Sequence, residues 1–269
     1  MERRRVGRSR MEAGVIGMGT WRTFDVRGPR VEAERHHLLD RAVAGGVDLF
    51  DSSPMYGEAE RVLGEAVTSF RDRVSIATKV WSADDGIAVR QLSKSLAHFG
   101  GRVELFQVHN LVAWPARLKM LEDLQNDAKV FAVGATHYSP GAFGQLAEVM
   151  RTGRIDAIQI PYNPGQREVE QEILPLAAAL DLGVLVMRPF GEGSLLRHSP
   201  SARELEPLRD FGVENWPQAL LKWVLSDTRC HVVLPATSSQ KHMGENLPAG
   251  EKPWLGAEER ALITRLAGG

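Results

Sequence analysis

The chain has 269 residues, which suits one α/β barrel of about 250 residues or two average domains. Its 33 basic and 34 acidic side chains nearly cancel, so the charge favours neither a nucleic-acid nor a membrane partner. The single cysteine, Cys230, excludes an intrachain disulfide and a cysteine-based metal site, and a reducing, cytoplasmic compartment is the simplest expectation.

The first ten residues, MERRRVGRSR, are basic and contain consecutive arginines. A twin-arginine export signal would need an apolar segment of about 7–15 residues after them. The segment that follows, MEAGVIGMGTW, contains Glu12 and several glycines and predicts a short strand instead. We expect the basic segment to form a solvated arm or a β-hairpin that closes the bottom of a barrel. No run of 18 apolar residues occurs, so we expect no membrane span.

Short apolar segments recur along the whole chain. They lack the polar–apolar alternation of half-exposed strands and are typical of strands buried on both faces. We predict strands at residues 15–20, 47–53, 74–79, 103–109, 130–136, 157–162, 183–189 and 232–237.

Amphipathic segments lie between these strands. Residues 31–46 place Leu38 and Ala42 on one stripe and end in two glycines, which is a helix C-cap signature. Ser139 and Pro140 predict an N-cap and a first helical residue. We predict helices at residues 31–46, 58–67, 89–101, 139–153, 168–183, 216–227 and 256–266.

Eight strands that alternate with helices predict βαβ units and a parallel sheet. A chain of 269 residues gives each unit about 34 residues, which favours a single-domain (β/α)8 TIM barrel over residues 1–269. A doubly wound open sheet is the alternative. It would normally carry a G-x-G-x-x-G fingerprint after its first strand, and GVIGMGTW does not match that pattern.

Four polar side chains fall at the ends of three successive predicted strands. Asp51 lies near the end of the second strand, Tyr56 lies in the loop after it, Lys79 ends the third strand and His109 ends the fourth. Because active sites of such barrels lie at the carboxyl ends of the strands, we expect these side chains to lie close together.

This set of residue types suits proton transfer to a carbonyl oxygen. A free tyrosine has a pKa of about 10, and a nearby lysine ammonium lowers that pKa by stabilising the phenolate. A carboxylate beside the lysine keeps the ammonium charged, and a histidine can donate a hydrogen bond to the same oxygen. Singly, each residue has an ordinary explanation as a turn cap, a packed aromatic, a solvated lysine or a core histidine.

Taken together, these segments resemble the aldo-keto reductase family. The family's Asp–Tyr segment, Lys strand and His strand resemble GVDLFDSSPMYG, VSIATKV and VELFQVHNL. Four further segments follow in the family's order: VGATHYSP, IDAIQIPYNP, VMRPFGEGSLL and VVLPATSSQKHMGEN. The resemblance runs from about Val6 to Asn246, and the motifs are specific as a set.

The resemblance implies an NAD(P)H-dependent reductase of aldehydes and ketones on a TIM barrel, without a metal. It implies that Tyr56 is the general acid/base, that Asp51 and Lys79 tune it, and that His109 orients the substrate carbonyl. We expect a small-molecule carbonyl substrate and a monomer or weak oligomer. The expected substrate-contacting residues are Trp21, Tyr56, Trp81 and His109, although either tryptophan can equally serve packing.

The resemblance also implies contacts to the cofactor along several segments. Thr136, His137 and Gln159 fall where the family holds the nicotinamide carboxamide, residues 188–194 where it covers the pyrophosphate, and residues 237–246 where it binds the adenosine half. An alternative for this last segment is a loop and helix start with Ser238 or Ser239 as N-cap. The expected cofactor-binding residues are Gly19, Thr20, Trp21, Asp51, Thr136, His137, Gln159, Met187, Arg188, Pro189, Phe190, Gly191, Gly193, Ser194, Ala236, Thr237, Ser238, His242, Glu245 and Asn246.

The sequence departs from the family pattern at three places. The family commonly has Ser-Asn at 136–137, where this chain has Thr-His, and often has a stacking aromatic at the position of Met187. It often has Lys and Arg where this chain has Ala236 and His242. Histidine cannot match the bidentate phosphate contact of arginine, so NADPH is the expected cofactor with NADH as the alternative.

Two other functions stay open at this point. One is a nucleotide-binding sensor or regulatory subunit of the same fold with little turnover. The other is a sugar or polyol dehydrogenase that works in the oxidative direction, which the same four residues would serve by microscopic reversibility.

Overall fold

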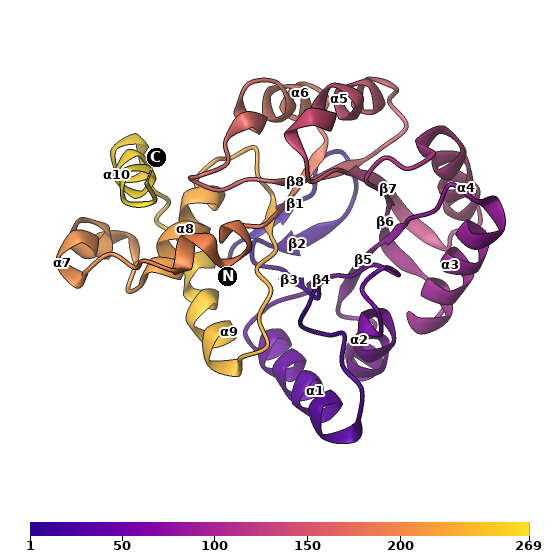
Figure 1. The fold of residues 1–269 in the computed structure, drawn as a ribbon, viewed down its shortest axis with the longest axis horizontal. Helices are drawn as coiled ribbons and strands as arrows, with labels where there is room; N and C mark the ends of the chain where they lie inside the picture. The colour runs from indigo at the N-terminus through magenta and orange to yellow at the C-terminus, as the bar shows by residue number, and fades with distance from the viewer. Residues whose placement is uncertain (269) are drawn as a thin grey trace.

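The structure is a computed structural model that describes residues 1–268, and its centre is an eight-stranded parallel sheet. Neighbouring strands follow one another in chain order from β3 to β10. Figure 1 shows these strands as an inner wall with the helices arranged around it. The strands are β3 (Met18–Gly19), β4 (Leu49–Asp51), β5 (Ser75–Val80), β6 (Val103–His109), β7 (Val130–Thr136), β8 (Ala157–Pro161), β9 (Gly183–Met187) and β10 (Val232–Val233).

Backbone hydrogen bonds between the first and last strands close the wall into a barrel. Ile16 forms a parallel bridge with Val233, whose N–H donates to Val15 O at 2.9 Å. On the same side, Gly17 N donates to Val233 O at 2.9 Å and Gly19 N donates to Pro235 O at 3.0 Å. The predicted (β/α)8 TIM barrel is thereby confirmed.

The first and last strands are shorter than the sequence predicts. Regular pairing covers only Met18–Gly19 of residues 15–20 and Val232–Val233 of residues 232–237. A Cβ on Gly17 would lie 2.7 Å from Leu234 Cδ2 and 3.0 Å from Leu49 O, so only glycine permits this close approach at the seam. Strand β4 is also shorter than predicted, since regular pairing covers Leu49–Asp51 of residues 47–53. The apolar segments of the sequence therefore overestimate the length of these strands.

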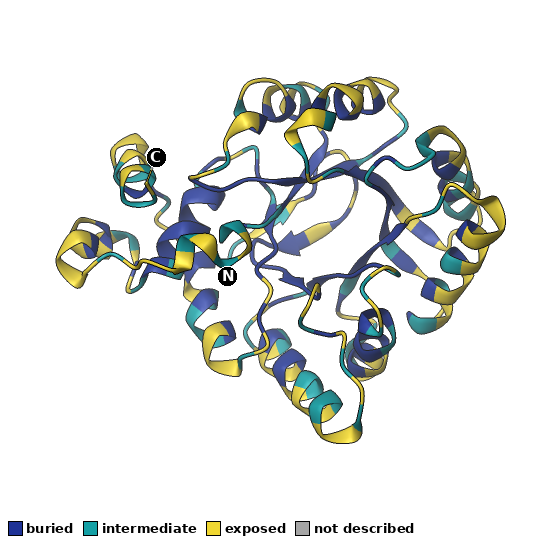
Figure 2. Cartoon of the chain, viewed as in Figure 1, coloured by how far each residue is buried: buried dark blue, intermediate teal, exposed yellow. Residues whose placement is uncertain are grey.

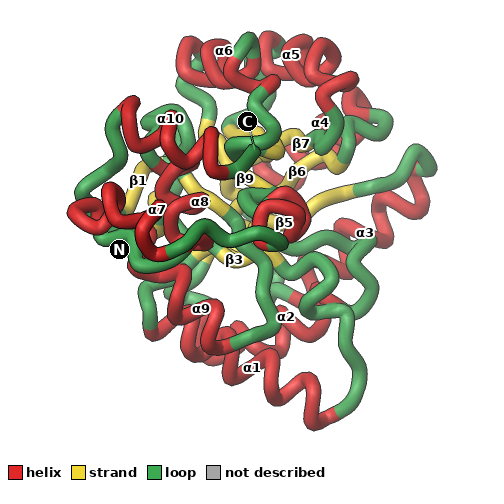
Figure 3. Tube along the Cα trace, turned by 60° about the vertical axis from the view of Figure 1, so that its left-hand side comes forward, coloured by secondary structure: helices red, strands yellow, loops and turns green. Residues whose placement is uncertain are grey.

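Ten α-helices cover the outside of the barrel in the described residues 1–268. Figure 2 shows that they present buried residues to the strands and exposed residues outward. Figure 3 shows α9 beside α1, and α10 and α7 near α8. The helices are α1 (Pro29–Ala44), α2 (Ala59–Val67), α3 (Asp85–His98), α4 (Trp114–Asn126), α5 (Phe143–Arg151), α6 (Ile173–Ala179), α7 (Ala202–Leu205), α8 (Trp216–Leu225), α9 (Gln240–Asn246) and α10 (Ala257–Leu266).

Helix α4 is absent from the sequence-based prediction. Its signals are Pro115 in the first turn and the inward spacing of Leu118 and Leu121. Arg117 also lies on its buried face and forms an ion pair with Asp85, so a charged residue interrupts the apolar stripe.

Two predicted helices are each divided into a short 3₁₀ turn and an α-helix. The segment 139–153 begins as Pro140–Ala142 before α5, and the segment 168–183 begins as Glu168–Glu170 before α6. Ser139 is the N-cap residue of the first of these turns and Pro140 is its first residue, as predicted, although the Ser139 side chain forms no capping hydrogen bond.

The basic N-terminal segment forms the expected β-hairpin. Strand β1 (Arg3–Arg5) pairs antiparallel with β2 (Glu12–Gly14). Val6 and Met11 are buried and join Leu49 and Leu105 in one apolar cluster inside the barrel. The hairpin therefore closes the barrel at the end opposite the carboxyl ends of the strands. Within residues 1–268, no helix combines the length and the apolar character needed to cross a membrane.

Candidate active site

A buried ion pair joins the ends of β4 and β5. Lys79 is only 1% exposed, and its Nζ donates to Asp51 Oδ1 at 2.7 Å, to Asp51 Oδ2 at 2.8 Å and to Ser52 O at 2.7 Å. Burial lowers the pKa of Lys79, but the charge and hydrogen bonds of Asp51, together with the charges of Tyr56 and Glu60, outweigh burial, and the net pKa is raised above its ordinary value. The ammonium therefore stays charged inside the barrel.

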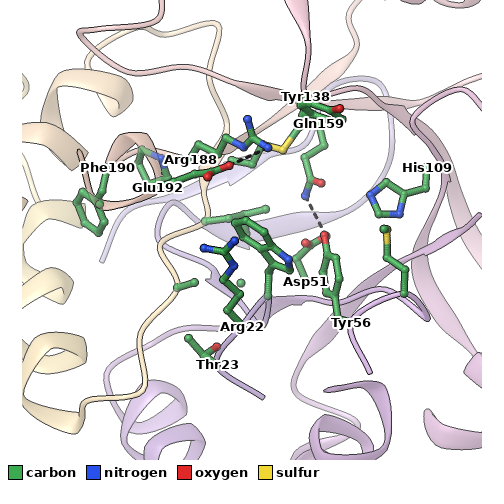
Figure 4. A pocket seen from close by; sticks show the side chains of 18 of the residues that line it. Arg22, Thr23, Asp51, Tyr56, His109, Tyr138, Gln159, Arg188, Phe190 and Glu192 are labelled. Carbon is green, nitrogen blue, oxygen red and sulfur yellow. Dashed lines mark hydrogen bonds and ion pairs between the residues drawn. The ribbon is translucent and has the colours of Figure 1, made fainter. Parts of the chain in front are cut away.

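Side chains at the ends of two other strands hold the Asp51 carboxylate and its backbone. Gln159 on β8 donates from Nε2 to Asp51 Oδ1 at 2.9 Å, as Figure 4 shows. Thr20, just after β3, donates from Oγ1 to Asp51 O at 2.9 Å. Because these contacts come from different strands, the carboxylate has a fixed orientation toward Lys79.

Tyr56 lies in the loop after β4, at the edge of the ion pair. Lys79 Nζ lies 5.4 Å from the centroid of its ring. Burial raises the pKa of Tyr56, and the positive charge of Lys79 only partly opposes this. The expected net lowering of the tyrosine pKa is therefore not what the structure gives, since burial outweighs the ammonium. At neutral pH the phenol retains its proton.

His109 ends β6 and faces Tyr56 edge-on, with ring centroids 6.0 Å apart and ring planes at 85°. Burial, assisted by the charge of Lys79, lowers the pKa of His109 to about 2, so the ring is neutral at neutral pH. Ser53 Oγ lies 3.1 Å from His109 Nδ1 and accepts a hydrogen bond from Met55 N at 3.4 Å. The Ser53 hydroxyl can therefore donate to Nδ1, which leaves Nε2 as the protonated nitrogen.

A cavity of about 470 Å³ opens at this end of the barrel. Its size falls within the range of small-molecule sites, about 300–1,000 Å³. Its wall includes most of the predicted strand-end residues, several of which Figure 4 shows. The predicted site residues that line it are Gly19, Trp21, Asp51, Tyr56, His109, Gln159, Met187, Arg188, Pro189, Phe190, Gly193 and Ala236. We call Asp51, Tyr56, Lys79, His109 and Gln159 the barrel-mouth cluster.

The other predicted site residues lie outside the cavity wall. Thr136 donates from Oγ1 to Gln159 O at 2.8 Å, and His137 Nδ1 accepts from Ser139 N at 3.0 Å, so both support the local backbone. Trp81 is 42% exposed and lies away from the cavity wall. The residues outside the wall are Thr20, Lys79, Trp81, Thr136, His137, Gly191, Ser194, Thr237, Ser238, His242, Glu245 and Asn246.

Eight cavity residues are absent from the sequence-based prediction. Most adjoin a predicted residue, as Met55 adjoins Tyr56 and Asn110 adjoins His109, so proximity in sequence was the available signal. The eight are Arg22, Thr23, Met55, Asn110, Tyr138, Glu192, Leu196 and Leu234.

The loop after β9 is held by interactions within the cavity wall. Arg188 forms an ion pair with Glu192 at 2.9 Å, and its guanidinium lies 4.8 Å from the centroid of the Tyr138 ring. Arg188 and Glu192 both have a φ of 55°, a left-handed conformation that costs a non-glycine residue about 1–2 kcal/mol. These contacts hold the loop in one shape beside the barrel mouth.

The segment after β10 begins helix α9. Ser239 is its N-cap and accepts from His242 N at 3.3 Å, while Ser239 N donates to Thr237 Oγ1 at 3.0 Å. The loop-and-N-cap interpretation of this segment is therefore confirmed as local structure. His242 is exposed. Its neighbour in the sequence, Lys241, forms an ion pair with Glu245 at 3.7 Å.

The barrel-mouth cluster can deliver a proton to an oxygen atom placed in the cavity. The protonated phenol of Tyr56 lies beside a buried cation, and His109 supplies a neutral N–H donor next to it. Within residues 1–268, no three His, Cys, Asp or Glu side chains are placed to hold a metal ion.

Comparison with known proteins identifies relatives of the whole chain. The aldo-keto reductase str7 of Strobilurus tenacellus is 27% identical over 276 residues, covering 87% of this chain and 81% of that protein. The methylglyoxal reductase YeaE of Escherichia coli is 24% identical over 262 residues, covering 93% of this chain and 90% of that protein.

Solved structures share the fold at lower identity. The aldo-keto reductase AKR11C1 of Bacillus halodurans has a TM-score of 0.82 and 22% identity, covering 99% of this chain and 96% of its own. An aldo/keto reductase of Klebsiella pneumoniae, solved with NADP and acetate, has a TM-score of 0.80 and 23% identity, with 96% and 92% covered. Residues 15–267 match the model of the aldo/keto reductase family, and the chain therefore belongs to this family of oxidoreductases.

Proposed function

We propose that the protein reduces aldehydes and ketones to alcohols with NADPH as the hydride donor. The observation that carries this proposal is the position of Tyr56. Its protonated phenol lines the cavity beside the buried Lys79–Asp51 pair, with the neutral His109 ring next to it. That arrangement supplies both a proton and a hydrogen-bond donor to one oxygen atom.

Residues around the cavity fit a nicotinamide cofactor. Asp51 holds Gln159 through its Nε2 atom, so the amide of Gln159 has a fixed direction in the wall and suits a carboxamide partner. Gly191 and Gly193 have φ values of 57° and 92°, and the loop that contains them lines the cavity through residues 188–190, 192 and 193. When bound, the reduced nicotinamide supplies a hydride to the carbonyl carbon.

Each side chain of the barrel-mouth cluster has one task in this mechanism. Tyr56 donates its proton to the carbonyl oxygen as the carbon gains hydride, so the product is the alcohol. The ammonium of Lys79 stabilises the phenolate that remains, and Asp51 holds that ammonium in place. Solvent then returns a proton to Tyr56. In the oxidative direction the same phenolate would accept the proton of an alcohol.

His109 is assigned to orientation rather than to proton donation. Its pKa of about 2 means that the imidazolium is scarcely populated at neutral pH. With Ser53 beside Nδ1, the Nε2–H group is free to donate a hydrogen bond to the carbonyl oxygen. The proton itself therefore comes from Tyr56.

The preference for NADPH over NADH rests on two solved structures of aldo-keto reductase from Klebsiella pneumoniae, one with NADP and one with NADPH. In this chain, Lys241 and His242 lie at the start of α9, where the family binds the adenosine half. Equilibrium binding of NADPH and NADH at low and high salt tests the preference. A 2′-phosphate contact at this exposed site should weaken with salt, and equal affinities would reject the preference.

The activity is tested by mixing the protein with NADPH and a panel of reactive aldehydes that includes methylglyoxal, with nicotinamide absorbance as the readout. Tyr56→Phe should lower kcat by about 10²–10⁴-fold, since it removes the acid, while NADPH binding is retained. Tyr162→Phe is the matched control, because Tyr162 is fully buried and lies outside the cavity wall. Its kcat should stay within about twofold of the wild type.

Unchanged turnover in Tyr56→Phe would reject the mechanism. If the wild type binds NADPH tightly but turns over no aldehyde and oxidises no sugar or polyol with NADP, the enzymatic proposal fails. The nucleotide-binding sensor then becomes the better description.

A further inference from the structure

Charged side chains lie at three places in or directly behind the cavity wall. At two of these places a positive and a negative side chain form an ion pair and cancel in charge. Asp51 pairs with Lys79 at 2.7 Å, and Glu192 pairs with Arg188 at 2.9 Å. The third is Arg22, which forms no salt bridge within 4.0 Å and donates no hydrogen bond to any of residues 1–268. The wall therefore carries one positive charge that the described part of the chain does not neutralise.

The backbone presents Arg22 in a fixed turn. Thr23 N and Phe24 N both donate to Thr20 O at 3.1 Å, and the side chain of Phe24 is fully buried. Arg35 also donates from Nε to Thr23 O at 2.6 Å. Arg22 itself has a φ of 61°, a left-handed conformation that a non-glycine residue keeps only when its surroundings hold it.

The side chain of Arg22 is also oriented. Its guanidinium lies 4.2 Å from the centroid of the Trp21 ring. Stacking uses the flat face of the guanidinium and leaves the N–H groups along its edge available to a bidentate acceptor such as a carboxylate or phosphate. Figure 4 shows the Arg22 side chain in the same cavity as Tyr56 and His109, with His109 at the other side of the view.

We propose that Arg22 binds an oxyanion, either a carboxylate or a phosphate, on a ligand that occupies the cavity. The inference rests on the proposed function, because that function supplies two candidate ligands: an acidic carbonyl substrate and the dinucleotide. Met55, Phe190 and Leu196 also line the cavity, so a substrate with an apolar body and an acidic end matches the wall. The oxyanion would bind at Arg22 while the carbonyl group meets Tyr56.

The substrate source is tested with two aldehydes that differ by one charge. These are 4-formylbenzoate and its methyl ester, and kcat/KM is measured for each at saturating NADPH. Arg22→Gln should lower kcat/KM for 4-formylbenzoate by about 10- to 100-fold, mainly through KM, because a charge-assisted bidentate contact is lost. The ester should stay within about twofold. Arg22→Lys keeps the positive charge but lacks the planar guanidinium. Its kcat/KM for 4-formylbenzoate should lie between those of the wild type and Arg22→Gln.

The cofactor source is tested by direct binding of NADPH, followed by quenching of tryptophan fluorescence. If the pyrophosphate supplies the oxyanion, Arg22→Gln should weaken NADPH binding by about tenfold or more, and the two aldehydes should then respond alike. Arg73→Gln is the matched control, since Arg73 is an exposed arginine stacked 5.1 Å from the Phe70 ring and lies outside the cavity wall. Arg73→Gln should change neither the kcat/KM of the two aldehydes nor the affinity for NADPH.

The inference is overturned if Arg22→Gln changes neither the ratio of the two aldehydes nor the affinity for NADPH. A failure of the proposed function looks different, since the wild type would then reduce neither aldehyde. In that case the affinities of the wild type and Arg22→Gln for NADPH and for 4-formylbenzoate, measured by calorimetry, still decide on Arg22.

Discussion

Tyr56 and Tyr162 both follow strands of the same barrel, and of these two only Tyr56 faces the cavity. The third tyrosine, Tyr138, follows β7 and also lines the cavity, where the Arg188 guanidinium lies over its ring. Tyr56 comes after β4 and Tyr162 directly after β8, so both lie beyond the carboxyl end of a strand. Each lies near a carboxylate and a cation. Tyr56 has Asp51 and Lys79 as neighbours, and Tyr162 donates to Glu170 Oε1 at 2.6 Å.

The hydroxyl of Tyr162 both donates and accepts a hydrogen bond within the protein. It accepts from Arg260 Nη2 at 2.7 Å while it donates to Glu170, and Asp227 Oδ2 lies 3.4 Å away. Arg229 completes this group through its ion pair with Asp227 at 2.6 Å. We call Tyr162, Glu170, Asp227, Arg229 and Arg260 the C-terminal cluster, because Arg260 connects it to helix α10.

The comparison shows that nearby charges do not by themselves make a tyrosine a catalytic acid. Burial raises the pKa of both tyrosines, so both phenols are protonated at neutral pH. Tyr162 is fully buried, and its proton is committed to Glu170. Tyr56 lies in the cavity wall, where a substrate oxygen can reach it. Access to a cavity therefore separates the catalytic group from the structural one.

The largest expected effect comes from breaking the ion pair of the barrel-mouth cluster. Lys79→Met would leave the Asp51 carboxylate buried without its cation and should lower the free energy of unfolding by about 3–5 kcal/mol, as measured by urea denaturation. Turnover of aldehydes should also fall by about 10³-fold or more, since the phenolate of Tyr56 loses its stabilising charge.

A double variant separates these two losses. Lys79→Met combined with Asp51→Asn removes both charges. The double variant should regain most of the free energy of unfolding that Lys79→Met loses, while its turnover stays low. If the double variant is no more stable than Lys79→Met alone, the buried unpaired carboxylate is not the cause of the instability.

A substitution in the C-terminal cluster should lower stability without lowering turnover. Tyr162→Phe leaves Arg260 Nη2 and Glu170 Oε1 without their shared hydroxyl and should lower the free energy of unfolding by about 1–3 kcal/mol. Turnover at a temperature where the variant is folded should be unchanged. Tyr56→Phe should change stability little and remove turnover. A loss of turnover in folded Tyr162→Phe would contradict the separation of the two clusters.

The fold and the centre of the site were accessible from the sequence because both depend on short, local patterns. Buried strands give apolar segments, and the polar residue that ends each segment lies at the carboxyl edge of the sheet. Asp51 and His109 therefore appear on the cavity wall as expected, with Lys79 directly behind Asp51.

The remaining features depend on contacts between distant segments. The sequence does not show that Arg188 pairs with Glu192 through a left-handed loop, or that Arg22 is stacked toward the cavity. Lys79 lowers the pKa of Tyr56 as predicted, but the net pKa is raised because burial exceeds the influence of Lys79. Burial is a property of the assembled barrel, so no local pattern encodes it.

A histidine next to the C-terminal cluster predicts how stability depends on pH. His231 Nδ1 accepts from Val184 N at 3.0 Å, and burial, assisted by the charge of Arg4, lowers its pKa to about 4. The unfolded chain has a histidine pKa of about 6.5, so between pH 6.5 and 4 the unfolded state binds more protons. Stability should therefore fall as pH falls through this window, by about 2 kcal/mol from His231.

The variant His231→Asn checks this assignment, because an amide oxygen can accept from Val184 N and does not titrate. Its free energy of unfolding should fall less between pH 6.5 and pH 4 than that of the wild type, by about 2 kcal/mol. His109 at the barrel mouth also resists protonation and remains in both proteins, so the difference isolates His231. Parallel pH profiles would show that His231 does not titrate in this window.

The smallest expected effect tests where the barrel-mouth cluster ends. Gln107 on β6 lies opposite Lys79 in the register of the β5–β6 pair and is fully buried. Neither its amide nitrogen nor its amide oxygen has a hydrogen-bond partner among residues 1–268. Gly134 makes room for it, since a Cβ there would lie 2.9 Å from Gln107 Cγ. Gln107→Leu keeps the volume and removes an unsatisfied amide, so the free energy of unfolding should rise by about 1 kcal/mol. Because Gln107 lies outside the cavity wall, turnover should stay within about threefold. A rise in stability with a tenfold loss of kcat would instead extend the cluster to a residue that never touches the cavity.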